Sequence, residues 1–179
     1  IEMTAREARY SFMLGLINDE SSEMLAVAHH ASDLAESVLM NIIRGAGTRG
    51  MAGMRDRRGC IIRPLLGISK YDIDEYVQNN NVPYGIDETN LSVQYTRNSI
   101  RLELLPYLQK KYNPNIYDTL NRLAMNAAED EDFLAGQAQH AMDGILIQEV
   151  GDFFRSFDGH AVAATYPAIG KRIIRMLLH

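Results

Sequence analysis

MLAVAHHASDLAESVLMNIIRG, residues 24–45, places a short apolar run directly before a segment with helical spacing. The run at 24–28 is typical of a buried strand in a parallel sheet. From Asp33 to Arg44 the apolar residues recur at helical intervals, and Gly45 is suited to end such a helix. The sequence therefore predicts a strand, a short turn and a helix.

The segments on either side continue this alternation. IIRPLL at 61–66 is apolar and interrupted by a proline, which predicts a second short strand. Ser69 is placed to cap a helix over 70–80, and the pattern at 4–18 predicts an earlier helix with Thr4 as its N-cap. Strands that alternate with helices indicate a layered α/β domain with parallel strands.

The second half of the chain has a mostly helical pattern. Residues 97–112 are amphipathic, with a predicted break at Pro106, and residues 114–150 keep a helical period throughout. Asp158 is expected to cap a small helix, and Pro167 to open the last one. We therefore expect an α/β part followed by an all-α part.

Composition excludes several classes of protein. The chain has 179 residues, of which 46% are hydrophobic and 23% charged, as in ordinary globular domains. No apolar run approaches the roughly 18 residues of a membrane-spanning helix. Cys60 is the single cysteine, which argues against a disulfide scaffold or a zinc finger and fits a cytoplasmic location. The chain begins with Ile1 rather than Met, so we expect a fragment.

Charge is unevenly distributed along the chain. The net charge is −5, yet residues 44–63 hold six arginines and one acid, and residues 97–111 hold four basic residues and one acid. Such clusters could bind nucleic-acid phosphates, or they could be ordinary solvated surfaces. The sequence alone leaves both interpretations open.

HHASDLAES at 29–37 is the sharpest candidate site, because ligands bind at the carboxyl ends of parallel strands. Asp33 and Glu36 are three residues apart and share a helical face, while His29 and His30 precede them on the turn. The group could hold Mg²⁺ through Asp33, orient an ammonium group or place a histidine beside a phosphate. Alternatively, Asp33 caps the helix and Glu36 complements the helix dipole.

Two further features suit phosphate. The loop at 44–59 is rich in glycine and arginine and is predicted to be irregular. Its backbone N–H groups and guanidinium groups could bind the phosphates of a nucleotide or of RNA. It matches neither the Walker A pattern nor the GxGxxG pattern. Arg97 and Arg101 are four apart on one helical face, where they could pair with acids or present themselves to phosphate.

Six motifs, taken in order and at their spacings, resemble the bacterial tRNA(Ile)-lysidine synthetase family of the PP-loop, or ATP-pyrophosphatase, superfamily. They are REARY (6–10), AHHASDLAESVLMNIIRGAGTRGMAGM (28–54), IIRPLL (61–66), SKYDIDEY (69–76), DETN (87–90) and RNSIRLELLPYL (97–108).

This resemblance implies that residues 1–112 are the C-terminal part of a Rossmann-like α/β domain, and that residues 113–179 form a helical domain that contacts tRNA. It implies an ATP-dependent ligase that attaches free lysine to the wobble cytidine of tRNA(Ile) with a CAU anticodon. ATP and Mg²⁺ are the implied cofactors, no membrane is involved, and a homodimer is left open. Both steps of such a reaction develop negative charge on a phosphate or on the leaving oxygen, and Mg²⁺ and arginine side chains are the groups expected to stabilise that charge.

The resemblance and the residue pattern together give a set of candidate site residues. The expected catalytic residues are Arg9, His29, His30, Asp33, Glu36, Arg97 and Arg101, with Asp33 also a candidate Mg²⁺ ligand. The expected nucleotide-binding residues are His29, Arg44, Gly45 and Gly47. The expected RNA-binding residues are Arg49, Arg55, Arg57, Arg58, Lys110 and Lys111.

Two departures from the family pattern matter. Ser37 stands where the family usually has threonine, and the family's Ser-Gly-Gly loop ending in Asp-Ser is absent, so we expect this chain alone to be inactive. The alternatives are a noncatalytic tRNA-binding module or another tRNA-modifying ATP pyrophosphatase. A tRNA thiolase is disfavoured, because Cys60 at the head of a buried strand is a poor nucleophile.

Overall fold

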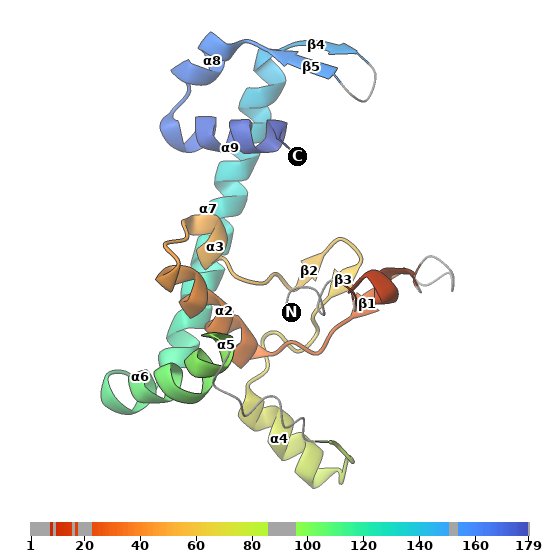
Figure 1. Cartoon of the computed structure of the whole chain (residues 1–179), viewed down its shortest axis with the longest axis vertical. Helices are drawn as coiled ribbons and strands as arrows, with labels where there is room; N and C mark the ends of the chain where they lie inside the picture. The colour runs from red at the N-terminus through yellow and green to blue at the C-terminus, as the bar shows by residue number, and fades with distance from the viewer. Residues whose placement is uncertain are drawn as a thin grey trace. The chain divides into compact units, whose positions relative to one another are not determined.

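The computed structural model divides into two compact units, Ile1–Ala124 and Met125–His179, each described by itself (Figure 1). The residues that the structure describes are 8, 10–15, 17, 23–85, 96–150 and 154–178. Of the predicted helix at 4–18, residues 8, 10–15 and 17 are described and are helical, whereas the predicted cap, Thr4, lies outside the described residues. The domain boundary expected after residue 112 stays a prediction.

The first unit contains a small three-stranded sheet. Its order is β1 (Leu25–Ala26), β3 (Ile61–Ile62) and β2 (Arg57–Arg58). β1 and β3 pair in parallel, as the two predicted strands should, whereas β2 pairs with β3 in the antiparallel direction. The sheet is therefore mixed and smaller than the parallel sheet expected from the sequence.

Helix α2 (Ala31–Ile43) follows β1 after a four-residue turn. It begins two residues before Asp33, and its N-cap is His30. Asp33 occupies the third helical position, where its Oδ2 accepts a hydrogen bond from the backbone N–H of His30 at 3.0 Å. Asp33 is therefore not the N-cap residue itself, but it does help to cap α2 as the third-position partner of a capping box. Gly45, with φ of +75°, ends the helix as predicted.

The glycine- and arginine-rich loop is more ordered than predicted. It contains the short helix α3 (Thr48–Met51) before β2 begins. Gly53 has φ of +61°, and a Cβ there would lie 2.7 Å from Leu34 Cδ1. Only glycine allows the loop to pass this close to α2. A four-residue helix is too short to show a periodic pattern in the sequence.

Helix α4 (Lys70–Asn79) forms where the sequence predicted it. The predicted cap is also confirmed, because the Ser69 hydroxyl accepts from the backbone N–H of Asp72 at 3.1 Å.

The amphipathic segment is one continuous helical rod with a widened middle turn. Its parts are α5 (Thr96–Ser99), the π-helical η2 (Ile100–Leu104) and α6 (Leu105–Lys111).

The predicted break at Pro106 is wrong, and the π turn explains why. Proline has no N–H to donate to the carbonyl four residues back, here that of Leu102, and its ring clashes with that carbonyl in a regular α-helix. The N–H of Leu105 instead donates to Ile100, five residues back. The wider turn absorbs the proline without ending the helix.

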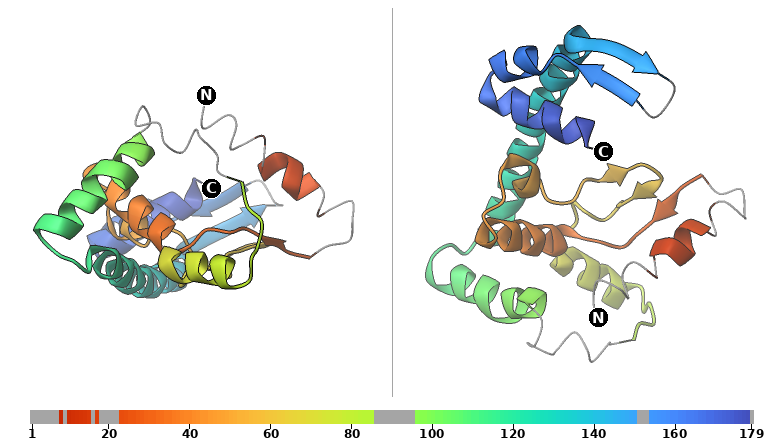
Figure 2. Two further views of the ribbon diagram at one scale, coloured as in Figure 1. Left: turned by 90° about the horizontal axis from the view of Figure 1, so that it is seen from below. Right: turned by 45° about the horizontal axis from the view of Figure 1, so that its top comes forward.

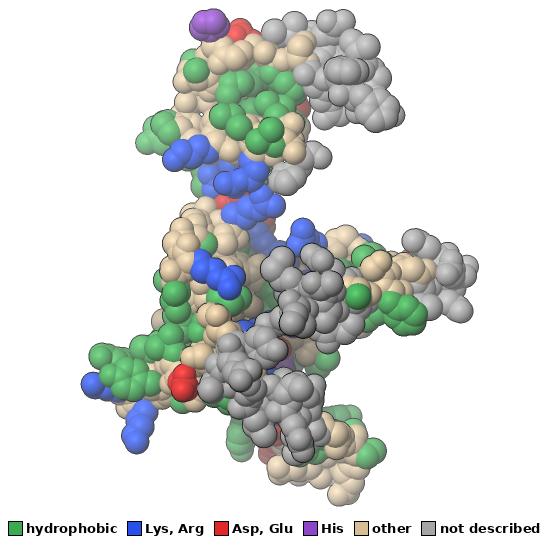
Figure 3. All heavy atoms as spheres, in the orientation of Figure 1, with side chains coloured by type: hydrophobic (Ala, Val, Ile, Leu, Met, Phe, Trp, Pro, Cys, Tyr) green, Lys and Arg blue, Asp and Glu red, His purple; other side chains and the backbone are tan. Residues whose placement is uncertain are grey.

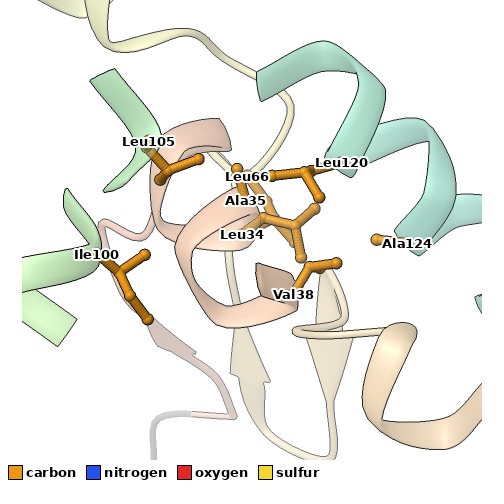
Figure 4. Packing of buried hydrophobic residues seen from close by; sticks show 8 residues of the cluster. All are labelled: Leu34, Ala35, Val38, Leu66, Ile100, Leu105, Leu120 and Ala124. Carbon is orange, nitrogen blue, oxygen red and sulfur yellow. The ribbon is translucent and has the colours of Figure 1, made fainter. Parts of the chain in front are cut away.

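The core of the first unit joins α2 to this rod and to the start of α7 (Ile116–Ile145), as Figure 4 shows. Contact across the core fixes the first turn of α2 beside α5 and η2. The buried cluster consists of Leu34, Ala35, Val38, Leu66, Ile100, Leu105, Leu120 and Ala124.

The second unit continues α7 and then forms a β-hairpin. α7 ends at Ile145, five residues before the predicted end, and β4 (Leu146–Val150) pairs antiparallel with β5 (Phe154–Phe157). The segment is rich in β-branched and aliphatic residues, which strand and helix both accept. The antiparallel pairing of β4 with β5 stabilises the strand conformation over a continued helix.

Two short helices complete the second unit (Figure 2). Asp158 caps α8 (Gly159–Ala164), and Pro167 opens α9 (Pro167–Leu177), both as predicted. Arg172 of α9 forms a buried ion pair with Glu131 of α7, which ties the last helix to the long one. Within the described residues, no helix is long and apolar enough to cross a membrane.

Candidate active site

Two carboxylates lie buried in the first turns of α2. Asp33 is 8% exposed and Glu36 is 1% exposed. Their three-residue spacing on a helix puts both on one face, as predicted. Buried carboxylates are costly unless they are paired, so their partners define the site.

Arg97 and Arg101 supply those partners. Arg97 donates through Nη2 to Asp33 Oδ1 at 3.1 Å and through Nε to Glu36 Oε2 at 3.0 Å. Arg101 donates through Nη2 to Asp33 Oδ1 at 2.9 Å and to Glu36 Oε2 at 3.0 Å, and through Nε to Glu36 Oε1 at 2.5 Å. The structure thus brings four predicted residues into one group, here called the carboxylate–arginine cluster, with formally balanced charge.

The π turn serves this arrangement. Ile100 and Leu105 are both buried in the core although they are five residues apart. On a regular α-helix this spacing separates two side chains by about 140°, whereas a wider turn brings them closer to one face. The rod can therefore bury both apolar side chains while Arg97 and Arg101 reach the carboxylates.

The two histidines flank the cluster. His30 Nε2 lies 3.5 Å from Asp33 Oδ2, in addition to the backbone contact that starts α2. His30 Nδ1 is buried and has no hydrogen-bond partner within the described residues. His29 is half-buried on the turn after β1. Both lie where the sequence placed them, at the carboxyl end of a parallel strand.

Electrostatics in the cluster favour charged arginine. The hydrogen bond to Glu36, with the nearby charge of Asp33, raises the pKa of Arg101 despite its partial burial. The guanidinium group is therefore a fixed positive charge at any pH at which the protein is folded.

Tyr117 is a neighbour of the site that sequence reasoning missed. It lies in the first turn of α7 and packs against the core cluster. Burial raises the pKa of the Tyr117 hydroxyl, the charge of Glu36 raises it further, and Arg101 partly offsets this. Because Tyr117 is far from Glu36 in the sequence, no local pattern could have indicated this proximity.

The donor set around Asp33 does not fit a magnesium ion as it is arranged here. Asp33 Oδ1 accepts from both arginines and Oδ2 accepts from His30. Within the described residues, no three or more His, Cys, Asp or Glu side chains are grouped as metal ligands. The Mg²⁺ site at Asp33 stays a prediction.

The predicted nucleotide-binding residues at the end of α2 lie apart from the cluster. Arg44 and Gly45 follow α2, and Gly47 is the N-cap of α3. Arg44 is eleven residues beyond Asp33, about 16 Å along the helix axis at the usual rise per residue. The structure does not bring these residues together with Asp33 and Glu36.

The predicted RNA-binding residues are mostly solvent-facing. Arg55 is half-buried, and its carbonyl accepts from Arg63 Nη1 at 2.8 Å. Arg9 lies outside the described residues. The exposed members of the set are Arg49, Arg57, Arg58, Lys110 and Lys111.

Comparison with known proteins gives the same assignment as the motifs. A tRNA(Ile)-lysidine synthase of Clostridium perfringens is 40% identical over 149 residues, which are 83% of this chain and 32% of the relative. The corresponding enzyme of Caldanaerobacter subterraneus is 33% identical over 98% of this chain and 37% of its own length. That of Parabacteroides distasonis is 47% identical over 72% of this chain and 30% of its own length. The chain therefore spans about a third of these relatives.

The resemblance inferred from the six motifs is thereby confirmed. The model of the PP-loop domain family matches residues 1–108, which include both carboxylates and both arginines of the cluster. The chain belongs to the PP-loop domain family.

Proposed function

We propose that this chain is part of an enzyme that attaches lysine to the wobble cytidine of a CAU-anticodon tRNA(Ile), with ATP as the activating substrate. The observation that carries the proposal is the carboxylate–arginine cluster, which unites α2 with α5 and η2 across more than 60 residues of sequence. The names of the relatives and the PP-loop family support it.

The proposed reaction has two steps. The C2 oxygen of cytosine attacks the α-phosphorus of ATP, forming an O–P bond while the bond to pyrophosphate breaks. The ε-amine of lysine then attacks C2, forming the C–N bond while the C2–O bond breaks and AMP leaves. The amine must arrive as a free base, so the ammonium group must give its proton to a nearby acceptor.

Asp33 is the better placed acceptor of the two carboxylates. Its side chain is 12% exposed and accepts two hydrogen bonds from arginine, whereas that of Glu36 is 1% exposed and accepts three. We assign to Asp33 the contact with the lysine ammonium group and the acceptance of its proton. Glu36 holds the two guanidinium groups in place.

The arginines are suited to the phosphate groups of ATP. Each uses Nε and Nη2 on the carboxylates, and within the described residues no hydrogen bond engages Nη1 of either arginine. The arginine side chains are 24% and 33% exposed, so these donors can meet an incoming oxyanion. Carboxylates that fix the orientation of arginine in advance reduce the cost of binding phosphate in the transition state.

The basic residues outside the cluster are assigned to tRNA. Arg57 and Arg58 lie on the exposed β2 strand, and Lys110 and Lys111 lie exposed at the end of α6. Phosphate contacts of this kind position an RNA without reading its sequence.

Lysine incorporation is the test. The full reading frame that contains this chain is incubated with ATP, labelled lysine and a CAU-anticodon transcript, with a GAU-anticodon transcript as control. We expect label only in the CAU transcript and no label from the 179-residue chain alone, because its sequence has no Ser-Gly-Gly phosphate loop. If the complete protein binds the transcript but never labels it, the noncatalytic tRNA-binding alternative is correct.

A further inference from the structure

The end of α6 carries two exposed tyrosines and a lysine in mutual contact. The rings of Tyr107 and Tyr112 are 5.8 Å apart at 67°, an edge-to-face pair. Lys111 Nζ lies 5.2 Å from the centre of the first ring and 5.7 Å from that of the second, and donates to the Tyr107 hydroxyl at 2.9 Å. These three residues are called the tyrosine–lysine cluster.

Both rings remain open to solvent. Tyr107 is 48% exposed and Tyr112 is 66% exposed. Figure 3 shows basic and apolar side chains next to one another at the end of α6. An edge-to-face contact covers one face of one ring, so aromatic surface is left for a further planar group.

The turn after α6 holds the cluster in a fixed position. The N–H groups of Tyr112 and Asn113 both donate to the Leu108 carbonyl at 3.0 Å. The Asn113 side chain donates to Thr119 Oγ1 of α7 at 3.0 Å, and Gln109 donates to the Pro114 carbonyl at 3.2 Å. Rings presented on a rigid turn lose little conformational entropy when they bind.

The charge around the cluster favours an anionic partner. The segment 104–117 contains two lysines, Lys110 and Lys111, and no acid, and it is flanked by Glu103 and Asp118. Glu103, the preceding acid, accepts a hydrogen bond from the Ser99 hydroxyl at 2.7 Å. Exposed aromatic rings next to lysines are the arrangement with which proteins bind unpaired nucleotides, because each base stacks on a ring and its phosphate meets a cation.

We propose that the tyrosine–lysine cluster is a stacking site for an unpaired nucleotide of the substrate tRNA. The inference rests on the proposed function for the identity of that RNA. The cluster lies on the same helical rod as Arg101, about 15 Å away along the axis at the usual rise per residue. One tRNA can therefore reach both, with the cluster binding an unpaired base of the same tRNA a few nucleotides from the reacting one.

The test compares tRNA binding by substituted forms of the complete protein at several salt concentrations. Tyr112→Ala should weaken binding about five-fold or more, as loss of one stacked base does, without changing the slope of log affinity against log salt. Tyr112→Phe should bind like the wild type, because the ring carries the contact. Lys111→Ala should lower the salt slope by about one, because a phosphate contact is lost.

Tyr71→Ala is the matched control. Tyr71 is 74% exposed on α4, next to the acids Asp72 and Asp74, and its loss should leave binding unchanged. A single-stranded oligoribonucleotide should compete for the cluster, and a blunt RNA duplex should not. Melting temperatures near that of the wild type establish that each variant folds.

The outcomes separate this inference from the proposed function. If wild-type protein does not bind the tRNA, the proposed function is wrong. If it binds and labels the tRNA but Tyr112→Ala binds equally well, only the stacking site is wrong. Equal weakening of tRNA binding by Tyr112→Ala and Tyr112→Phe would assign the contact to the hydroxyl and overturn the stacking site. If the cluster binds another protein instead of RNA, tRNA affinity will be unchanged in every tyrosine variant.

Discussion

Arg101 binds Glu36 through one edge of its guanidinium group, with Nε 2.5 Å from Oε1 and Nη2 3.0 Å from Oε2. The two residues are 65 positions apart in the sequence. Glu36 is almost completely buried, so this contact, with that of Arg97, provides the stabilisation that water would otherwise give to its charge. The pair is therefore both a structural link between α2 and η2 and the frame of the candidate active site.

Replacing Glu36 should destabilise the first unit. Glu36→Gln removes the negative charge that three arginine hydrogen bonds share, and it replaces one of the two accepting oxygens with an NH₂ group that cannot accept. We expect a loss on the order of 3 kcal/mol in the free energy of unfolding, measured by urea denaturation. Glu103→Gln, an exposed control, should cost under about 1 kcal/mol. Equal losses in the two variants would contradict a structural role for the buried pair.

Asp33→Asn should separate chemistry from folding. Asparagine keeps an oxygen that can accept from the His30 N–H and start α2, but it removes the charge assigned to the lysine ammonium group. In the complete enzyme we expect lysine incorporation to be lost while the free energy of unfolding falls by less than in Glu36→Gln, because the Asp33 side chain is 12% exposed and accepts two rather than three arginine hydrogen bonds. Near-normal turnover would return Asp33 to a purely structural role.

The exposed arginines of β2 should contribute to the salt dependence of tRNA binding. Arg57→Ala combined with Arg58→Ala should flatten the plot of log affinity against log salt by up to about two phosphate equivalents, and should weaken all tRNAs alike. Filter binding at several salt concentrations measures the slope. Lys70→Ala is the control, because that lysine is paired with Asp74 on α4. An unchanged slope in the double variant would identify β2 as an ordinary solvated surface.

Tyr117 should make stability depend on alkaline pH. Burial, with the charge of Glu36, raises the pKa of its hydroxyl, so the folded state holds this proton more tightly than the unfolded chain does. That contribution is complete below the tyrosine pKa of the unfolded chain, about 10, and is lost as pH rises through the higher folded value. Denaturation at pH 9 and above 10 should show a smaller loss for Tyr117→Phe than for the wild type. Tyr71→Phe, which changes an exposed ring, should lose as much as the wild type.

The sequence was sufficient for features that depend on neighbouring residues. The strand and helix around Asp33, the cap at Ser69 and the proline that opens α9 all follow from local patterns. It was insufficient where a tertiary contact decides between local alternatives. The hairpin after Ile145 depends on the pairing of two strands, which no local pattern shows. The spacing of Arg97 and Arg101 predicts a shared helical face, but only the packing of α2 against the rod shows that Asp33 and Glu36 are their partners.

The same dependence on packing applies to the widened turn before Pro106. A helix with a π turn competes with a regular helix of the same sequence, in which every residue after the turn is rotated by about 100° relative to those before it. Proline at 106 disfavours the regular alternative, because the regular helix would place its ring against a carbonyl. Pro106→Ala should therefore admit the second register, detectable as reduced lysine incorporation with unchanged helix content by circular dichroism. The uncharged ring of Pro106 thus favours one of two rotational registers of the rod, and only the favoured register places its arginines opposite the acids of α2.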